Sequence, residues 1–369
     1  MFVDFLRIIF NKNFLFSICL HILHGFVFEK SKLYFPYTFG RNILFIKTDV
    51  YKFYISISFI SLGVPYVFSK ILPNKYLSAR SHISDRYESR SILEANVGGY
   101  LLGVSTLLTG FCPSYLPIYL AINPKLFLYS IIASYIAFSC YQFYYIAFYH
   151  RLRPKFDNNE RKTPESVSND QETLHNIERI IILALCVILL IVLETIEQSL
   201  PPGHSADELH DLISNGDYLP PGLTGVICGL ILTLLVFICN EYETLSSEWL
   251  MNICSYTTGL PHRMKRVTGR MCLEQTLKIL SMAYGARLSL WLSSAQEVPN
   301  IDRLFYSLVT IGSFFSALSI CLTTATFTDH IYLTNAFIGN ITSDIVPIMI
   351  ISAWTIIYLT QLLDITNLK

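Results

Sequence analysis

Long apolar runs recur along the chain, and each has about the length of a helix that crosses a bilayer. A bilayer core requires roughly 20 predominantly apolar residues per helix, and nine segments of this sequence meet that requirement. They are 13–29, 51–69, 94–112, 126–149, 179–198, 221–240, 271–293, 304–325 and 345–363. The pattern predicts an all-α polytopic membrane protein with nine transmembrane helices in a lipid bilayer.

The polar segments between these runs predict the orientation of the chain, because cytoplasmic loops are enriched in Lys and Arg. Segments 70–93, 150–178 and 241–270 are basic, whereas 199–220 contains no Lys or Arg and is acidic. Nine spans place the three basic segments on one side, so we expect the N-terminus in the cytoplasm and the C-terminus on the opposite side. The basic segment 30–50 does not fit: either the scheme is wrong there or the segment dips back into the protein.

The order of the runs divides the chain into two membrane halves. Residues 1–149 form an N-terminal repeat of four spans, and 150–178 is a strongly polar stretch that we interpret as a cytoplasmic linker. A connecting transmembrane helix, 179–198, follows, and 199–369 forms a C-terminal repeat of four spans. The single connecting helix inverts the second half relative to the first.

A small-residue pattern occurs once in each half. The run from Gly98 to Cys112 overlays the run from Gly312 to Thr326, with small residues matching small residues. Inverted repeats are a common transporter architecture, with the substrate near the bilayer midplane at the repeat interface. Small residues are also frequent wherever membrane helices pack, so the overlay supports the inverted repeat without requiring it.

Each small-residue run is followed by residues that interrupt a helix or carry charge. Pro113 directly follows Cys112, and the pair Asp329 and His330 closely follows Thr326. Proline breaks a helix, and a broken helix at membrane depth is tolerated where it lines a wet cavity or is buried in protein. We therefore predict broken or re-entrant segments whose free amides can receive an anion. The alternative is that these helices simply end at the membrane interface.

Composition excludes several classes of protein. Apolar residues make up 52% of the chain and charged residues 15%, against about 25% charged residues in soluble domains. Basic and acidic residues balance at 27 each, so no charge excess indicates nucleic acid. The nine cysteines form no Cys-x-x-Cys pair of the kind that binds zinc, and no catalytic or phosphate-binding motif is present. We expect no enzymatic activity, no metal and no cofactor.

Three stretches together resemble the YeeE/YedE sulphur-transport family. The first is His24-Gly25-Phe26-Val27-Phe28-Glu29-Lys30-Ser31-Lys32 with the residues up to Arg41, the second runs from Gly98 to Pro113, and the third from Gly312 to His330. The resemblance covers most of residues 13–363. It implies an hourglass-shaped helical protein with inverted repeats, whose transporting members import thiosulfate or related compounds past cysteines at a constriction.

The resemblance also implies roles for individual residues. Cys112 corresponds to the cysteine of the Cys-Pro motif and is expected to donate a hydrogen bond to the anion. Tyr34 and Thr326 stand where the family has cysteines, and their hydroxyl groups can still donate hydrogen bonds. His330 corresponds to the motif's histidine, although Asp329 replaces its glycine. With Asp329, His330 could form a proton-linked pair or cap a helix end.

Basic residues within and beside the apolar runs are the remaining feature that indicates an anionic substrate. Arg287 lies inside an apolar run, and a charge at membrane depth is a functional hypothesis by default. It could attract an anion, pair with Glu194 or Glu197, or extend to the interface. The cluster of Glu29, Lys30, Lys32 and Arg41 could form a vestibule that steers anions, or a solvated rim with internal salt bridges.

Two functions follow from these observations. The first is transport of a small sulphur-containing, thiosulfate-like anion, with Cys112, Pro113, Tyr34, Thr326, His330 and Arg287 as the residues at the pore. The second is a transport-inactive membrane scaffold or partner subunit that retains the transporter fold, because two of three motif cysteines are replaced. The sequence leaves the oligomeric state open.

Overall fold

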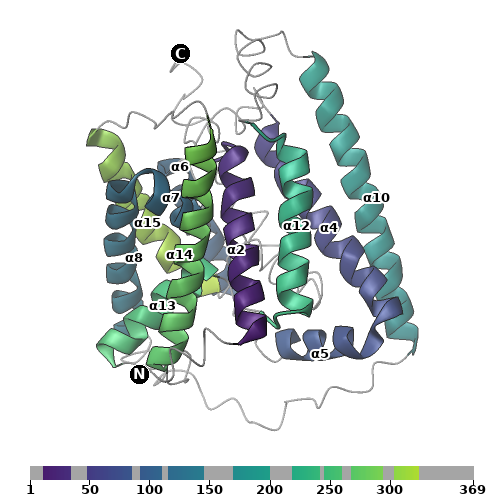
Figure 1. The fold of residues 1–369 in the computed structure, drawn as a ribbon, viewed down its shortest axis with the longest axis horizontal. Coiled ribbons are helices and arrows are strands. Elements are labelled where there is room, and N and C mark those ends of the chain that lie inside the picture. Colours follow the sequence, from purple (N-terminus) through teal and green to yellow (C-terminus); the bar gives the residue numbers. More distant parts are fainter. Residues whose placement is uncertain are drawn as a thin grey trace.

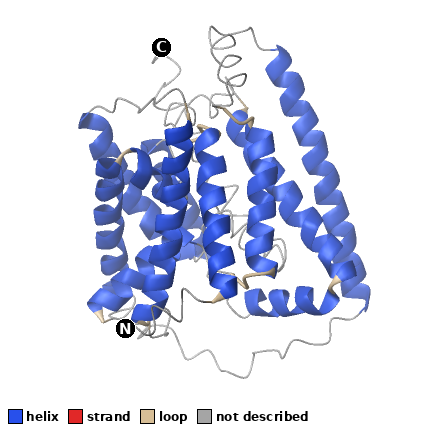
Figure 2. Cartoon of the chain, viewed as in Figure 1, coloured by secondary structure: helices blue, strands red, loops and turns tan. Residues whose placement is uncertain are grey.

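The computed structural model describes residues 11–34, 48–84, 92–109, 115–144, 169–199, 218–241, 245–259, 267–293 and 303–323. Within these ranges the regular structure is entirely helical (Figure 2). The eleven helices are α2 (Lys12–Lys30), α4 (Asp49–Ile71), α5 (Pro73–Ser84), α6 (Ile92–Thr109), α7 (Leu116–Ile122), α8 (Pro124–Tyr144), α10 (Asn169–Ser199), α12 (Pro221–Phe237), α13 (Leu245–Thr258), α14 (Gly269–Leu292) and α15 (Arg303–Thr323).

Among the described residues, four helices are long and apolar enough to cross a membrane: Asp49–Ile71, Pro124–Tyr144, Arg179–Ile196 and Leu304–Leu322. Helix α12 is apolar but shorter. Only 17% of the apolar window of α10 is buried in the protein, and its large aliphatic side chains are exposed along its length. An exposed apolar helix of this kind fits a lipid environment, and the structure agrees with an α-helical membrane protein. The number of nine spans stays a prediction.

The long helices pack as pairs that join the two halves of the sequence (Figure 1). Helix α2 packs on α14, α4 packs on α12, and α6 packs on α15. Helices α2 and α14 run in the same direction, because Glu29 contacts Ser289 and Lys30 contacts Ser293, while His21 and Lys278 both approach Glu241.

Glycines allow two of these pairs to approach closely. A side chain at Gly25 of α2 would collide with the backbone of Met282 in α14, and one at Gly285 of α14 would collide with the backbone of Ile22. In the pair α4 and α12, a Cβ at Gly229 would lie 2.8 Å from the Cβ of Ile60. Small residues at such crossings let membrane helices pack by backbone contact.

The pair α6 and α15 is antiparallel, and its contacts exchange under the small-residue overlay. The Ser319 hydroxyl donates a hydrogen bond of 2.7 Å to the Gly98 carbonyl. At the other end of the pair, a Cβ at Gly312 would lie 3.1 Å from the carbonyl oxygen of Ser105. The overlay matches Gly98 with Gly312 and Ser105 with Ser319, so each contact is the counterpart of the other.

The described helices follow the expected apolar runs to within a few residues, and three further helices lie in segments expected as loops or breaks. Helix α5 lies in 70–93, and it runs across the ends of α4 and α12 (Figure 1). Helix α13 lies in 241–270, and α7 follows the position of the expected break. Helix α10 begins within 150–178, the stretch expected to be a linker. The last expected span, 345–363, lies outside the described residues.

Candidate functional site

The C-terminal end of α2, which belongs to the first motif, is the centre of a cluster of buried polar side chains. The helix ends at Lys30, and the Ser31 hydroxyl donates a hydrogen bond of 2.6 Å to the Phe28 carbonyl. Lys32 then adopts a left-handed backbone conformation, with φ of 55°, and its amide donates to the Glu29 carbonyl at 3.1 Å. Such a turn costs a non-glycine residue roughly 1–2 kcal/mol, while the carbonyl end of a helix favours nearby cations.

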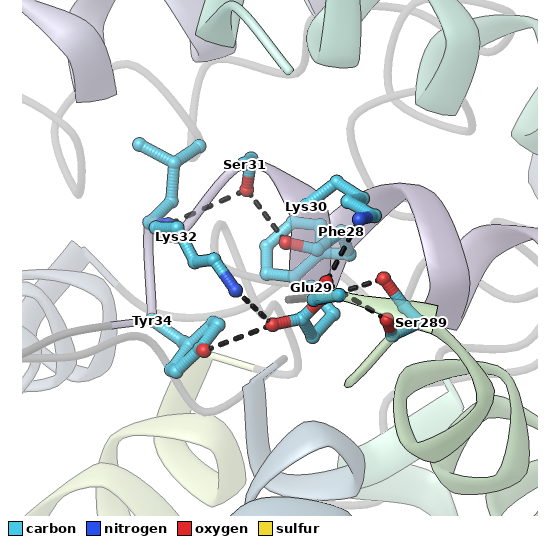
Figure 3. A network of polar contacts seen from close by, with 9 residues as sticks. Phe28, Glu29, Lys30, Ser31, Lys32, Tyr34 and Ser289 are labelled. Atoms are coloured by element: carbon cyan, nitrogen blue, oxygen red, sulfur yellow. Dashed lines mark hydrogen bonds and ion pairs between the residues drawn. The ribbon is translucent and has the colours of Figure 1, made fainter. Parts of the chain in front are cut away.

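The Glu29 carboxylate is fully buried and accepts three contacts from described side chains (Figure 3). The Lys32 ammonium pairs with Oε1, and the Tyr34 hydroxyl donates to the same oxygen at 3.2 Å. The Ser289 hydroxyl of α14 donates to Oε2 at 2.5 Å. A buried carboxylate is tolerated only when it is paired and hydrogen-bonded, and these three donors meet that requirement.

Tyr34, an expected pore residue, is enclosed rather than open. Its side chain has no exposed surface, and its hydroxyl is engaged by Glu29. The Tyr119 hydroxyl of α7 donates to the Tyr34 carbonyl, and the two rings stand edge to face with centroids 6.2 Å apart. These contacts hold Tyr34 against both α2 and α7.

Lys30 links α2 to two other helices. Its ammonium donates to the Ser293 hydroxyl, at the end of α14, at 2.8 Å. Its carbonyl accepts from the amide of Leu219, just before α12, at 2.9 Å. The ends of α2 and α14 and the start of α12 therefore meet at one place.

The described ionisable groups at this place carry a net positive charge. Lys30 and Lys32 are cations and Glu29 is an anion, which leaves one positive charge. Lys30 is 8% exposed and the Lys32 side chain 19% exposed. The expected vestibule is therefore a buried cluster, and not a solvated rim, for the members that the structure describes; Arg41 lies outside them. In a poorly solvated site, an ammonium attracts an anion more strongly than in water.

Arg287 lies two residues before Ser289 on α14 and contacts α7. Its side chain is exposed, and its Nη1 donates to the carbonyl of Ala121 in α7 at 3.5 Å. The expected pairing with Glu194 is wrong, since the Glu194 carboxylate pairs with Lys52 of α4 at 2.5 Å. The side chain of Glu197 lies outside the described residues.

The other expected site residues, Cys112, Pro113, Thr326 and His330, lie outside the described residues, and so does Asp329. Within the described part of the chain, α6 ends at Thr109 and α7 begins at Leu116. No group of His, Cys, Asp and Glu side chains suited to a metal ion occurs among the described residues.

Sequence reasoning missed the partners that α14 and α7 supply. Ser289 and Ser293 are four residues apart on one face of α14 and contact Glu29 and Lys30 respectively. Serines on an apolar helix are usually interpreted as packing residues, so their role follows only from the pairing of α2 with α14. The role of Tyr119 could not be predicted either, because this residue follows a proline-rich stretch that has no recognisable sequence pattern.

No protein-family model matches this sequence, and a search of curated proteins finds no match.

Proposed function

We propose that this protein is a membrane transporter for a small, thiosulfate-like anion, built from two inverted repeats. The observation that carries the proposal is the exchange of contacts between the two halves: Gly98 with Ser319, and Gly312 with Ser105. These contacts make the two runs antiparallel, which is the arrangement that a twofold axis relating inverted repeats requires. Architectures of this kind are common among secondary transporters.

The directions of the other helices support the same architecture. Helix α2 and its counterpart α12 are antiparallel, because Lys30 lies next to Leu219 at one end and His21 approaches Glu241 at the other. Helix α2 runs with α14, and α12 runs with α4, because Gly229 lies next to Ile60 and Gly225 next to Ser56. Each first helix thus packs in parallel on the second helix of the other half.

The anion site that we propose is the end of α2 where it meets α12 and α14. Lys30 and Lys32 supply two ammonium groups against the one carboxylate of Glu29. Oxygen-rich anions are bound by ammonium donors, which Lys30 and Lys32 carry here, whereas the hydroxyl protons of Ser289 and Ser293 are already donated to Glu29 and to the Ser289 carbonyl. The preference for a sulphur anion rests on the resemblance alone, as do the roles of Cys112, Thr326 and His330.

The test is uptake of radiolabelled thiosulfate into proteoliposomes containing the full chain. Lys30→Gln removes the buried ammonium and should abolish most uptake, whereas Lys30→Arg should retain part of it. Lys125→Gln is the matched control, because Lys125 is exposed in the first turn of α8 and carries the same charge. All variants are first compared by thermal unfolding, so that loss of fold is separated from loss of transport.

Cys112→Ala tests the mechanism that the resemblance implies. Lost uptake in a folded variant supports a hydrogen bond from this thiol to the anion. Unchanged uptake retains transport and removes Cys112 from the mechanism. If the folded wild type transports neither thiosulfate nor a panel of small anions, the proposed function is wrong.

One observation favours the second function, a transport-inactive scaffold or partner subunit. Tyr34 occupies an expected cysteine position, yet it is fully buried and bonded to Glu29 and Tyr119. A side chain held in this way closes the space around it instead of lining a path. Under this alternative, Tyr34→Ala and Cys112→Ala alter only stability, and no anion crosses the membrane.

A further inference from the structure

A second buried charged group lies two turns before Glu29 on α2. His21 is 1% exposed, and its Nε2 lies 4.0 Å from Oε2 of Glu241, just past the end of α12. The ammonium of Lys278, on α14, lies 3.0 Å from the other carboxylate oxygen of Glu241. The group therefore joins the same three helices as the Glu29 cluster, about 12 Å away along α2 at 1.5 Å per residue.

The hydrogen bonds of His21 assign its tautomer. Its Nδ1 lies 2.8 Å from the Ser17 carbonyl oxygen, which can only accept a hydrogen bond. Nδ1 therefore carries the proton and donates it to this carbonyl, with the Ser17 hydroxyl oxygen 3.3 Å away as a second contact, and in a neutral imidazole the other nitrogen is then an acceptor. Nε2 is buried, and no described residue makes a hydrogen bond to it.

Two acceptors consequently face one another. Nε2 and an oxygen of the Glu241 carboxylate lie 4.0 Å apart, and a carboxylate has no proton to give. A single proton on Nε2 would convert this contact into a charge-assisted hydrogen bond, which has an ordinary length of about 2.7–2.9 Å. The gap is about one ångström longer than that bond.

We propose that His21 and Glu241 form a proton-binding site, with Lys278 as the cation that holds the carboxylate when the proton is absent. Without the proton, Glu241 and Lys278 balance each other; with it, Glu241 is shared between two cations. Proton binding draws α2 toward the end of α12 and weakens the ion pair between Glu241 and Lys278 of α14.

The surroundings contain few other groups that could compete for the proton. Among the described residues, α12 has no charged side chain, and on α7 the Tyr119 hydroxyl is bonded to the Tyr34 carbonyl. Cys239 lies next to Glu241 in sequence, and His24 lies one turn along α2. Glu241 is 13% and Lys278 15% exposed, which gives the proton a route from water.

The proton site stands on its own contacts and does not require transport. In the transporter proposed above, this proton would be the coupling ion. Only this coupling role rests on the proposed function. The test therefore measures proton binding directly, by nitrogen NMR of histidine-labelled full chain in lipid nanodiscs, with His21→Gln to assign the signal. Its failure would leave the transport proposal untouched.

Two variants should move the midpoint of His21 protonation in opposite directions. Glu241→Gln removes the attracting carboxylate and should lower the midpoint by about one pH unit or more, while Lys278→Met removes a competing cation and should raise it by a similar amount. Lys125→Met is the control and should change nothing.

If the variants fail to fold, measurements on the wild-type protein alone still test the proposal. Above the midpoint, His21 should carry its proton on Nδ1, and it should take up a second proton as the pH is lowered through the midpoint. A proton on Nε2 in the neutral form overturns the proposal, as does an absence of titration down to the lowest pH at which the protein stays folded. A midpoint that neither Glu241→Gln nor Lys278→Met moves overturns it too.

Discussion

The crossing of α2 and α14 permits a sharp test of the fold, because it depends on the absence of two side chains. Gly25 and Gly285 each face the backbone of the other helix, at Met282 and Ile22. A methyl group at either position meets a carbonyl oxygen that no change of rotamer can move. Gly25→Ala must therefore push the two helices apart.

The magnitude follows from opposing terms. Replacing Gly by Ala inside a helix gains about 1 kcal/mol of helix propensity. Overpacking typically costs about 1–3 kcal/mol, and separation of the helices also breaks the close Cα–H to carbonyl interactions, worth about 0.5–1 kcal/mol each. If the two interactions at this crossing both break and overpacking has its full cost, the net destabilisation is about 3–4 kcal/mol.

The matched control is Gly63→Ala, in α4. A Cβ at Gly63 would lie 3.8 Å from Leu183 Cδ2, an ordinary contact distance. This variant should be as stable as the wild type, or more stable by up to about 1 kcal/mol. Thermal unfolding of purified protein in detergent compares the two, with Gly25→Ala expected to melt several degrees lower.

The double variant Gly25→Ala with Gly285→Ala sharpens the test. Both residues lie at one crossing, so helices already separated by the first methyl accommodate the second at reduced cost, and the two losses should not add. If Gly25→Ala unfolds at the same temperature as Gly63→Ala, α2 and α14 do not cross by backbone contact, and the packing described above is wrong.

Three further predictions follow from particular contacts. Lys32→Met leaves the buried Glu29 carboxylate without its ion pair and should lower the free energy of unfolding by up to about 3 kcal/mol. This loss is below the usual range for a fully buried pair because Lys32 is partly exposed. The control Lys125→Met should lose no stability, and equal melting temperatures of the two variants would refute the pairing. Thr276→Val removes the acceptor of the Trp249 indole, 2.9 Å away, and should cost about 1–3 kcal/mol in the same assay; an unchanged melting temperature would mean that the indole is not bonded there. In a background without native cysteines, an impermeant maleimide should label Lys125→Cys from outside and Gly259→Cys only after permeabilisation; the reverse result would invert the predicted orientation.

Local patterns in the sequence predicted most of the helices, because the length and polarity of a span are local properties. The run expected over 221–240 is the helix Pro221–Phe237, and that over 304–325 is Arg303–Thr323. The two runs that the small-residue overlay compares, from Gly98 and from Gly312, are in contact in the structure, while the inverted repeat inferred from them stays a prediction.

Contacts between distant residues could not be predicted in the same way. Glu29 and Ser289 are 260 residues apart, and nothing local to either residue indicates the other. His21 was overlooked because a histidine on an apolar helix has no distinguishing pattern until Glu241 and Lys278 are brought beside it. Helix α5 was missed because its polar sequence resembles a loop, although Tyr76 and Ala79 pack on Val236 and Phe237.

The most direct test of the central proposal is counterflow in proteoliposomes. Vesicles with the wild-type protein are loaded with unlabelled thiosulfate and diluted into a trace of labelled thiosulfate. A thiosulfate transporter exchanges the two and accumulates label transiently, whereas vesicles without protein do not. If folded protein accumulates no label, with thiosulfate or with any of a panel of small anions inside, the protein does not transport anions and the scaffold function takes its place.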